Sequence, residues 1–232
     1  MTDFVFTLSS GAEIPVIITT RRGLRNITLR PRFNPKREIH ISKPWLVSTS
    51  AAIRFLESKQ RWIECVFQKC PTKIKLKSGD RIKFLGRDIM LIHEPNIRAN
   101  RFDMETMTLY VGGGADMFER RVRDFIKSEF LSELKNMIRS VPSAFHPKRI
   151  ALRDTTSRWG SCSSTGTMSF SWRLAFAPTY VMRYVVMHEL AHTKHMDHSD
   201  NFWMTVRELY GPGVECAKRW LSQHGGELHL YF

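Results

Sequence analysis

Two histidines four residues apart, His188 and His192, with a glutamate directly after the first, constrain the fold of this chain more than any other feature. A helix turns roughly 100° per residue, so both imidazoles would project from one helix face and could bind one metal ion. Glu189 would face that ion from too far round to bind it, which leaves its carboxylate free to take a proton from a coordinated water. The spacing therefore predicts a helical metal site with Glu189 as the catalytic general base.

A third ligand is expected because a catalytic zinc takes about three protein ligands and keeps one position open. His198 is the best candidate. On an unbroken helix His198 would lie about 120° from His192 and could not reach the same ion, so the helix must end between them. Asp197 and Ser199 are good residues for starting a second helix. That segment has an apolar stripe at helical spacing: Phe202, Trp203, Val206, Leu209 and Tyr210. We therefore expect His198 in a turn between two helices, with Zn²⁺ as the cofactor.

Other residues of this region have weaker claims. His195 would lie about 10 Å along the axis from His188 on a continuing helix, which is too far for a shared ion, but it remains an alternative to His198. Glu208 or Glu215 could bind the metal or accept a hydrogen bond from a ligating imidazole, although a solvated helix charge is the commoner role. Three residues are candidates for stabilising a developing oxyanion: Arg158, Arg173 and Tyr184.

Several short strings around the two histidines form a pattern together: Arg-Trp-Gly-Ser-Cys-Ser at 158–163, Trp-Arg-Leu at 172–174, Ala-Pro at 177–178, His-Glu-Leu-Ala-His at 188–192, His-Ser at 198–199 and Phe-Trp at 202–203. This pattern resembles the YgjP-like family of small zincin-type metal-dependent hydrolases, which are related to the WLM and SprT-type metallopeptidases. The resemblance is dense from about residue 158 to residue 228. It implies a zinc held by His188, His192 and His198, with Glu189 catalytic. Metzincins are disfavoured, because His195 stands where they carry glycine and no Met-turn follows.

The apolar patterning predicts an α+β protein, a zincin-like metallopeptidase domain with a β-rich basic N-terminal region. Strands are expected at 4–8, 14–20, 26–30, 38–42, 73–77, 81–85, 88–93, 106–111, 149–154, 158–163 and 167–174. Helices are expected at 49–68, 116–140 and 214–223, besides the two around the metal site. Three consecutive glycines at 112–114 place a boundary between the N-terminal region, residues 1–111, and the catalytic domain, residues 112–232. The strand at 167–174 is a candidate edge strand for an extended peptide substrate, with a core strand as the equal alternative.

Charge and composition indicate the compartment and possible partners. Of the net charge of +14, residues 1–102 contribute +12, with 20 Lys and Arg against 8 Asp and Glu. Such a region attracts polyanions, including nucleic acid and nucleotides, although a solvated basic surface explains it equally well. The four cysteines form no Cys-x-x-Cys pair, and no apolar run approaches the ~20 residues of a membrane span. We expect a cytoplasmic protein with reduced thiols and no membrane partner.

Three functions fit these features. The first is a zinc-dependent hydrolase, most simply a metallopeptidase that acts on a peptide or protein substrate. The second is a metal-dependent UTP pyrophosphatase, because some YgjP-like proteins are described so and a basic surface suits an anionic nucleotide. The third is a non-enzymatic nucleic-acid-binding module. Glu189 argues against the third, since a structural metal site has no use for a general base.

Overall fold

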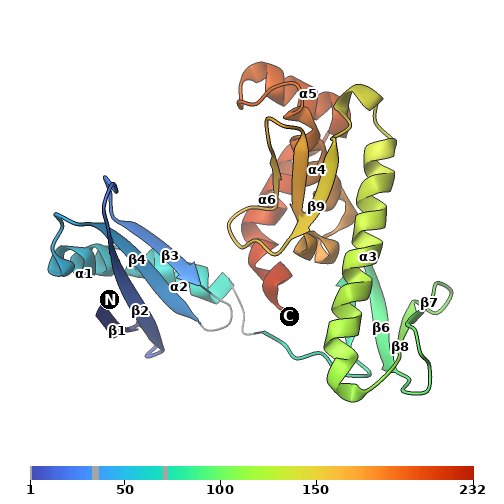
Figure 1. Ribbon diagram of the computed structural model, residues 1–232, viewed down its shortest axis with the longest axis horizontal. Helices are drawn as coiled ribbons and strands as arrows, with labels where there is room; N and C mark the ends of the chain where they lie inside the picture. The colour runs from blue at the N-terminus through green and yellow to red at the C-terminus, as the bar shows by residue number, and fades with distance from the viewer. Residues whose placement is uncertain (1, 33–36, 70–72) are drawn as a thin grey trace. The chain divides into compact units, whose positions relative to one another are not determined.

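The computed structural model describes residues 2–32, 37–69 and 73–232. Backbone contacts divide the chain into two compact units, Met1–Thr72 and Lys73–Phe232. Each unit has a separate core of buried apolar side chains. Helices and small sheets are mixed along the chain, which confirms the predicted α+β class (Figure 1).

The N-terminal unit is a four-stranded sheet with two helices. Its strands, in the order β1-β2-β4-β3, are β1 (Thr2–Thr7), β2 (Glu13–Arg21), β4 (Glu38–Pro44) and β3 (Thr28–Arg32). Alternation along β2 and β4 buries one face of the sheet, where Ile39 and Ile41 are fully enclosed. The single helix predicted for 49–68 is two helices, α1 (Thr49–Ser58) and α2 (Gln60–Lys69). The break falls at Lys59, whose backbone leaves the helical region at φ −104° and ψ 9°.

The second unit begins with a small sheet that the sequence predicts in part. Its strands, in the order β5-β6-β8-β7, are β5 (Arg81–Phe84), β6 (Arg87–His93), β8 (Thr108–Val111) and β7 (Arg101–Asp103). The strand expected at 73–77 is absent from this sheet, since Ile74 makes only an isolated bridge to Tyr231. The three-residue β7 was not predicted, because so short a segment carries no readable alternation.

The compact units divide at a different place from the boundary predicted between residues 111 and 112. Residues from β5, β6 and β8 share one core with the helix that follows them, so this sheet belongs to the same compact unit as residues 112–232. Gly112 is a site of close backbone approach, because a Cβ there would lie 2.2 Å from the carbonyl oxygen of Ile97. The glycine run thus reflects packing within one unit.

Helix α3 (Phe118–Arg139) is the longest helix of the described chain and follows a short 3₁₀ turn, η1 (Ala115–Met117). Its buried residues recur every fourth position: Phe118, Val122, Ile126, Phe130, Leu134 and Ile138. This stripe is the one that the sequence predicts, and it packs against α4 and the 3₁₀ helix η3 (Trp172–Phe176). A further 3₁₀ turn, η2 (Ser143–Phe145), follows α3.

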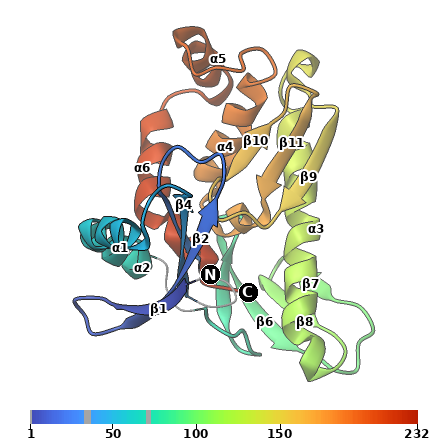
Figure 2. The same cartoon turned by 60° about the vertical axis from the view of Figure 1, so that its left-hand side comes forward.

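A three-stranded sheet lies next to the metal-site helix. Its strands, in the order β10-β11-β9, are β10 (Gly160–Cys162), β11 (Thr167–Ser171) and β9 (Arg149–Arg153), which lie side by side in Figure 2. Of the two alternatives for residues 167–174, the structure confirms the core strand and not the edge strand. Strand β11 is central, because it pairs antiparallel with β10 and parallel with β9, and Trp172 already begins η3. The edge of the sheet beside α4 is β10.

Helix α4 (Thr179–Ala191) is the central element of the unit. Nine of its 13 residues are buried, which is why it is apolar on almost every side, unlike a surface helix. It packs against α3, β10, α5 (Asp200–Tyr210) and α6 (Val214–His224). The chain then forms a last 3₁₀ turn, η4 (Gly225–His229). His188 and Glu189 therefore belong to a helix that is buried on almost every side.

The structure also describes three of the four cysteines and bears on whether any helix could span a membrane. Cys65, Cys162 and Cys216 are free thiols, and Cys70 lies outside the described residues. Among the helices that are described, none combines the length and the apolar character needed to cross a bilayer.

His229 in η4 makes the stability of this unit depend on pH. Burial, reinforced by the charge of Arg173, lowers the pKa of His229 from 6.5 to about 4. Between pH 4 and pH 6.5 the unfolded chain therefore binds more protons at this histidine than the folded protein does. The free energy of unfolding consequently decreases as the pH falls from about 6.5 towards 4. At pH 5 we expect the loss to be roughly 2 kcal/mol relative to pH 7. The variant His229→Gln should show a correspondingly smaller pH dependence.

Urea-induced unfolding at pH 7 and pH 5 measures this effect. His146→Gln is the matched control, because His146 is an exposed histidine of the same unit. An identical change in unfolding free energy between the two pH values for wild type and His229→Gln would contradict the prediction.

Candidate metal centre

Three histidines converge where α4 ends and α5 begins. His188 lies in the last turn of α4, His192 is its C-cap, and His198 lies in the turn before α5. One ligand nitrogen of each ring lies within 4.8 Å of those of the other two. The Nε2 atoms of His188 and His198 are 3.3 Å apart, and two imidazole nitrogens on a tetrahedral zinc at about 2.0–2.1 Å would be separated by about 3.3 Å. The cluster therefore fits a zinc-sized ion.

A hydrogen bond fixes the orientation of His192. Its Nδ1 lies 2.9 Å from the carbonyl oxygen of His195 and can only donate to it, which places the proton on Nδ1 and leaves the Nε2 lone pair free. His195 was an alternative ligand from the sequence. Its ring is outside the cluster of the described residues, and it acts here through its main-chain carbonyl.

The first turn of α5 forms an apolar wall behind all three rings. Phe202 is fully buried, and its ring centroid lies 4.9 Å from that of His188, 4.5 Å from His192 and 4.7 Å from His198. Trp203 contacts His188 and His198 from the side, with centroids 5.7 and 6.0 Å away. The sequence predicts these two residues as part of a core stripe. The structure adds that they hold the imidazoles in place and limit the access of water.

Burial favours the neutral form of His188 and His192. It lowers the pKa of His188 to about 4, with His192 and His198 adding to the effect, and it lowers the pKa of His192 as well. The Nδ1 atom of His188 is buried without a hydrogen-bond partner among the described residues. Neutral rings with free lone pairs are the form in which histidine binds metals, so the donor set and its surroundings suit a cation.

Glu189 is buried beside the edge strand β10. Its side chain is only 5% exposed, and burial raises its pKa to about 7, opposed by the charge of Arg158. A Cβ on Gly160 would lie 2.5 Å from both Cγ and Oε1 of Glu189. Any side chain at position 160 would displace this carboxylate, so the sequence analysis missed Gly160 as a residue that the position of Glu189 requires. The sequence held one indication of this, since a glycine inside a short strand often marks the close approach of another group.

The structure separates the three oxyanion candidates. Arg173 is 2% exposed and is fully engaged, since it donates to both carboxylate oxygens of Asp154 and to the carbonyl oxygens of Tyr231 and Phe232. Arg173 is therefore a structural residue and no longer a candidate for stabilising an oxyanion. Arg158 stays a candidate because its charge acts on Glu189.

Tyr184 also stays a candidate. Its ring contacts that of His188 at 5.9 Å, and burial raises its pKa to about 12, which keeps the hydroxyl protonated and able to donate. The two glutamates weighed as ligands have other positions. Glu208 is exposed on α5, and Glu215 pairs with Lys218 at 3.0 Å.

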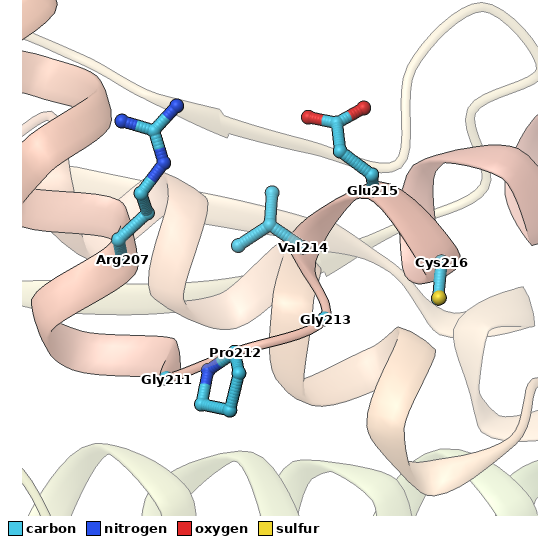
Figure 3. Close-up of a pocket in the computed structure, with 7 residues that line it drawn as sticks. All are labelled: Arg207, Gly211, Pro212, Gly213, Val214, Glu215 and Cys216. Carbon is cyan, nitrogen blue, oxygen red and sulfur yellow. The ribbon is translucent and has the colours of Figure 1, made fainter.

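Two hollows lie in the neighbouring surface. One, of about 430 Å³, is formed by the connection between α5 and α6, where Arg207 and Glu215 extend to the same side with Val214 between them (Figure 3). Its lining includes none of the three histidines and not Glu189. The other, of about 220 Å³, is lined by Gly160 and by Arg153 and Arg158, and it therefore adjoins the strand that contacts Glu189.

Comparisons with known proteins assign the chain to a family. A family model described as YgjP-like, metallopeptidase domain, matches residues 25–224. Among solved structures, the crystal structure of the metallopeptidase zymogen of Pyrococcus abyssi abylysin matches with 21% identity and a TM-score of 0.32. That match covers 41% of this chain and 92% of the other. No curated protein matches the chain.

Proposed function

The chain belongs to the YgjP-like metallopeptidase family, and from this premise we propose that it is a zinc-dependent metallopeptidase. Membership of the family carries the coarser statement, a metal-dependent hydrolase. The observation that supports the finer one is the convergence of His188, His192 and His198 around one point, with Glu189 between the first two. Three imidazoles suit zinc better than magnesium, which prefers oxygen ligands.

In this proposal His188, His192 and His198 hold the ion and Glu189 moves the proton. When bound, zinc supplies Lewis acidity, which lowers the pKa of a coordinated water and polarises the scissile carbonyl. The Glu189 carboxylate accepts a proton from the attacking water and then delivers it to the leaving amine nitrogen. Burial raises the pKa of Glu189 to about 7 without a metal, and the positive charge of a bound zinc would lower it again, which favours the carboxylate that accepts the first proton.

Arg158 and Tyr184 are the residues proposed to stabilise the developing oxyanion. Each carries donors that stay protonated, Arg158 through its guanidinium and Tyr184 through its phenol. Each is also coupled to the site, Arg158 through the carboxylate of Glu189 and Tyr184 through the ring of His188.

A second candidate function is the hydrolysis of a nucleoside triphosphate such as UTP. The observation that favours it is the pair of arginines, Arg153 and Arg158, in the hollow beside β10, since guanidinium groups bind phosphate well. Binding of nucleic acid to the basic region of residues 1–102 stays a prediction.

One experiment separates the two functions. The zinc-loaded protein is given an unfolded protein and, separately, UTP, and the chelated and reloaded protein serves as the control. We expect new amino termini from the protein substrate, lost on chelation and regained with zinc. Release of pyrophosphate from UTP without any peptide-bond cleavage would reject the metallopeptidase in favour of the second candidate.

Removal of His198 should cost the protein its metal. We expect His198→Ala to weaken zinc affinity by more than about 100-fold, because losing a ligand should exceed the cost of losing a partner that only orients one. Competition with a chromophoric chelator measures the affinity. His195→Ala is the matched control, since His195 contributes its main-chain carbonyl, which the substitution leaves in place. Retention of zinc by His198→Ala together with its loss from His195→Ala would reverse the assignment.

A further inference from the structure

The hollow of about 220 Å³ lies on the open face of the β10-β11-β9 sheet. Met168 and Phe170 of β11 are buried in the core, so the alternate residue Ser169 faces the other way. Ser161 of β10 is directly opposite Ser169 in the sheet and shares that face. Both serines line the hollow together with Arg153, at the end of β9, and Arg158, just before β10.

The two arginines are available to a ligand. In the part of the chain that the structure describes, neither Arg153 nor Arg158 makes an ion pair or a hydrogen bond through its guanidinium group, and both residues are exposed. The loop that carries Arg158 is held in place, because the Thr155 hydroxyl donates to the carbonyl oxygen of Arg158 at 2.8 Å. Two unpaired guanidinium groups over a row of hydroxyl groups form a site for an anion.

Strand β10 places a bound peptide next to this hollow. Within the described sheet, β10 pairs with β11 on one side and has a free edge on the other. A peptide that adds to this edge as a further strand would set the side chain opposite Ser161 on the face of Ser161, above the hollow. Its neighbouring peptide groups would lie along Gly160, which contacts Glu189.

We propose that the hollow lined by Arg153 and Arg158 binds an acidic side chain, Asp or Glu, of a peptide substrate held along β10. The inference rests on the proposed metallopeptidase function and names its substrate class. A volume of about 220 Å³ is below the ~300–1,000 Å³ of pockets for drug-sized ligands and suits one side chain. Arg153 can donate a pair of hydrogen bonds to a carboxylate and Arg158 adds its positive charge, whereas an uncharged amide gains much less.

The test uses internally quenched peptides that differ in one residue, Glu, Gln or Lys, placed at each position in turn. For the zinc-loaded wild type we expect kcat/KM to be roughly tenfold or more higher for Glu than for Gln at one position near the cleaved bond. Arg153→Glu should remove this preference and raise the rate for Lys at that same position. Arg149→Glu is the matched control, because Arg149 lies on the same face of β9 but outside the hollow.

Equal rates for Glu and Gln at every position, or an equal response to Arg149→Glu, would overturn the inference. A binding measurement keeps it testable if no peptide is cleaved. Affinity of the zinc-loaded Glu189→Gln variant for the same Glu and Gln peptides should differ by roughly tenfold, and Arg153→Glu should abolish the difference. A preference for binding the Glu peptide without any cleavage would reject the metallopeptidase function and support the site for an acidic side chain. Cleavage without a preference for Glu over Gln would support the metallopeptidase function and reject that site. If UTP displaced the bound Glu peptide and the Glu and Gln peptides bound equally well, the hollow would be a site for phosphate.

Discussion

The variant Glu189→Gln should bind zinc as the wild type does and hydrolyse substrate about 10²–10⁴-fold more slowly. Glutamine has the shape of the glutamate that it replaces and fits the space beside Gly160, but its amide cannot accept the proton of the attacking water. The measurement is kcat on whichever substrate the wild type turns over, together with the zinc content of the same preparation. Glu208→Gln, on the exposed face of α5, is the matched control and should leave both unchanged.

The same variant should unfold less readily. The pKa of Glu189 is raised to about 7 in the folded protein from an ordinary value of 4.5, so the folded state loses stability as the pH rises between these values. A neutral glutamine removes that cost, and metal-free Glu189→Gln should therefore be at least as stable as the metal-free wild type at pH 7 and above. Activity that survives in a correctly folded, zinc-loaded Glu189→Gln variant would exclude Glu189 as the general base.

Addition of one methyl group to Gly160 should be almost as damaging. The new Cβ of Gly160→Ala would lie 2.5 Å from Cγ and Oε1 of Glu189, which is closer than real side chains allow, so the carboxylate must move. A displacement of about 1 Å in a catalytic group can cost about 100-fold in rate. We expect a loss of kcat of that order with the three histidines, and hence the zinc content, unaffected. Steady-state kinetics and metal analysis on one sample measure both.

Two further variants identify the cause of such a loss. Ser164→Ala, in the exposed turn after β10 and outside the hollow, should leave kcat unchanged. The double variant Gly160→Ala with Glu189→Ala removes Cγ and the carboxylate and so makes room for the new methyl group. It should recover any stability lost by Gly160→Ala without recovering activity. If Gly160→Ala keeps its full rate, the glycine is needed only for folding or not at all.

The parts of the structure that local pattern determines could be predicted from the sequence. The stripe of α3 recurs at every fourth residue, and its limits were found within two residues. The His188–His192 spacing and the helix break before His198 follow from helix geometry, so the convergence of three rings could be derived from the chain alone. The role of Glu189 as general base stays a prediction from the same motif.

Long-range packing determines the parts that could not be predicted. The position of β11 between β9 and β10 depends on parallel pairing across a long connection, which alternation along one strand does not encode. Lys59 ends α1 without a glycine or proline to signal it. The role of Gly160 depends on its contact with Glu189, a residue far along the chain, and the attachment of the β5–β8 sheet to the catalytic unit depends on shared burial.

The three proposed ligands differ in how firmly the fold holds them, and this difference would determine how fast an ion binds and dissociates. The Phe202 ring contacts all three imidazoles, but His188 and His192 are also held by α4, whereas His198 is exposed on a turn. Opening of that turn detaches one ligand while two remain, so the residence time of the metal should follow the motion of residues 193–199 rather than any unfolding of the core. A chelator would then remove the metal from the protein at the rate at which this short turn opens.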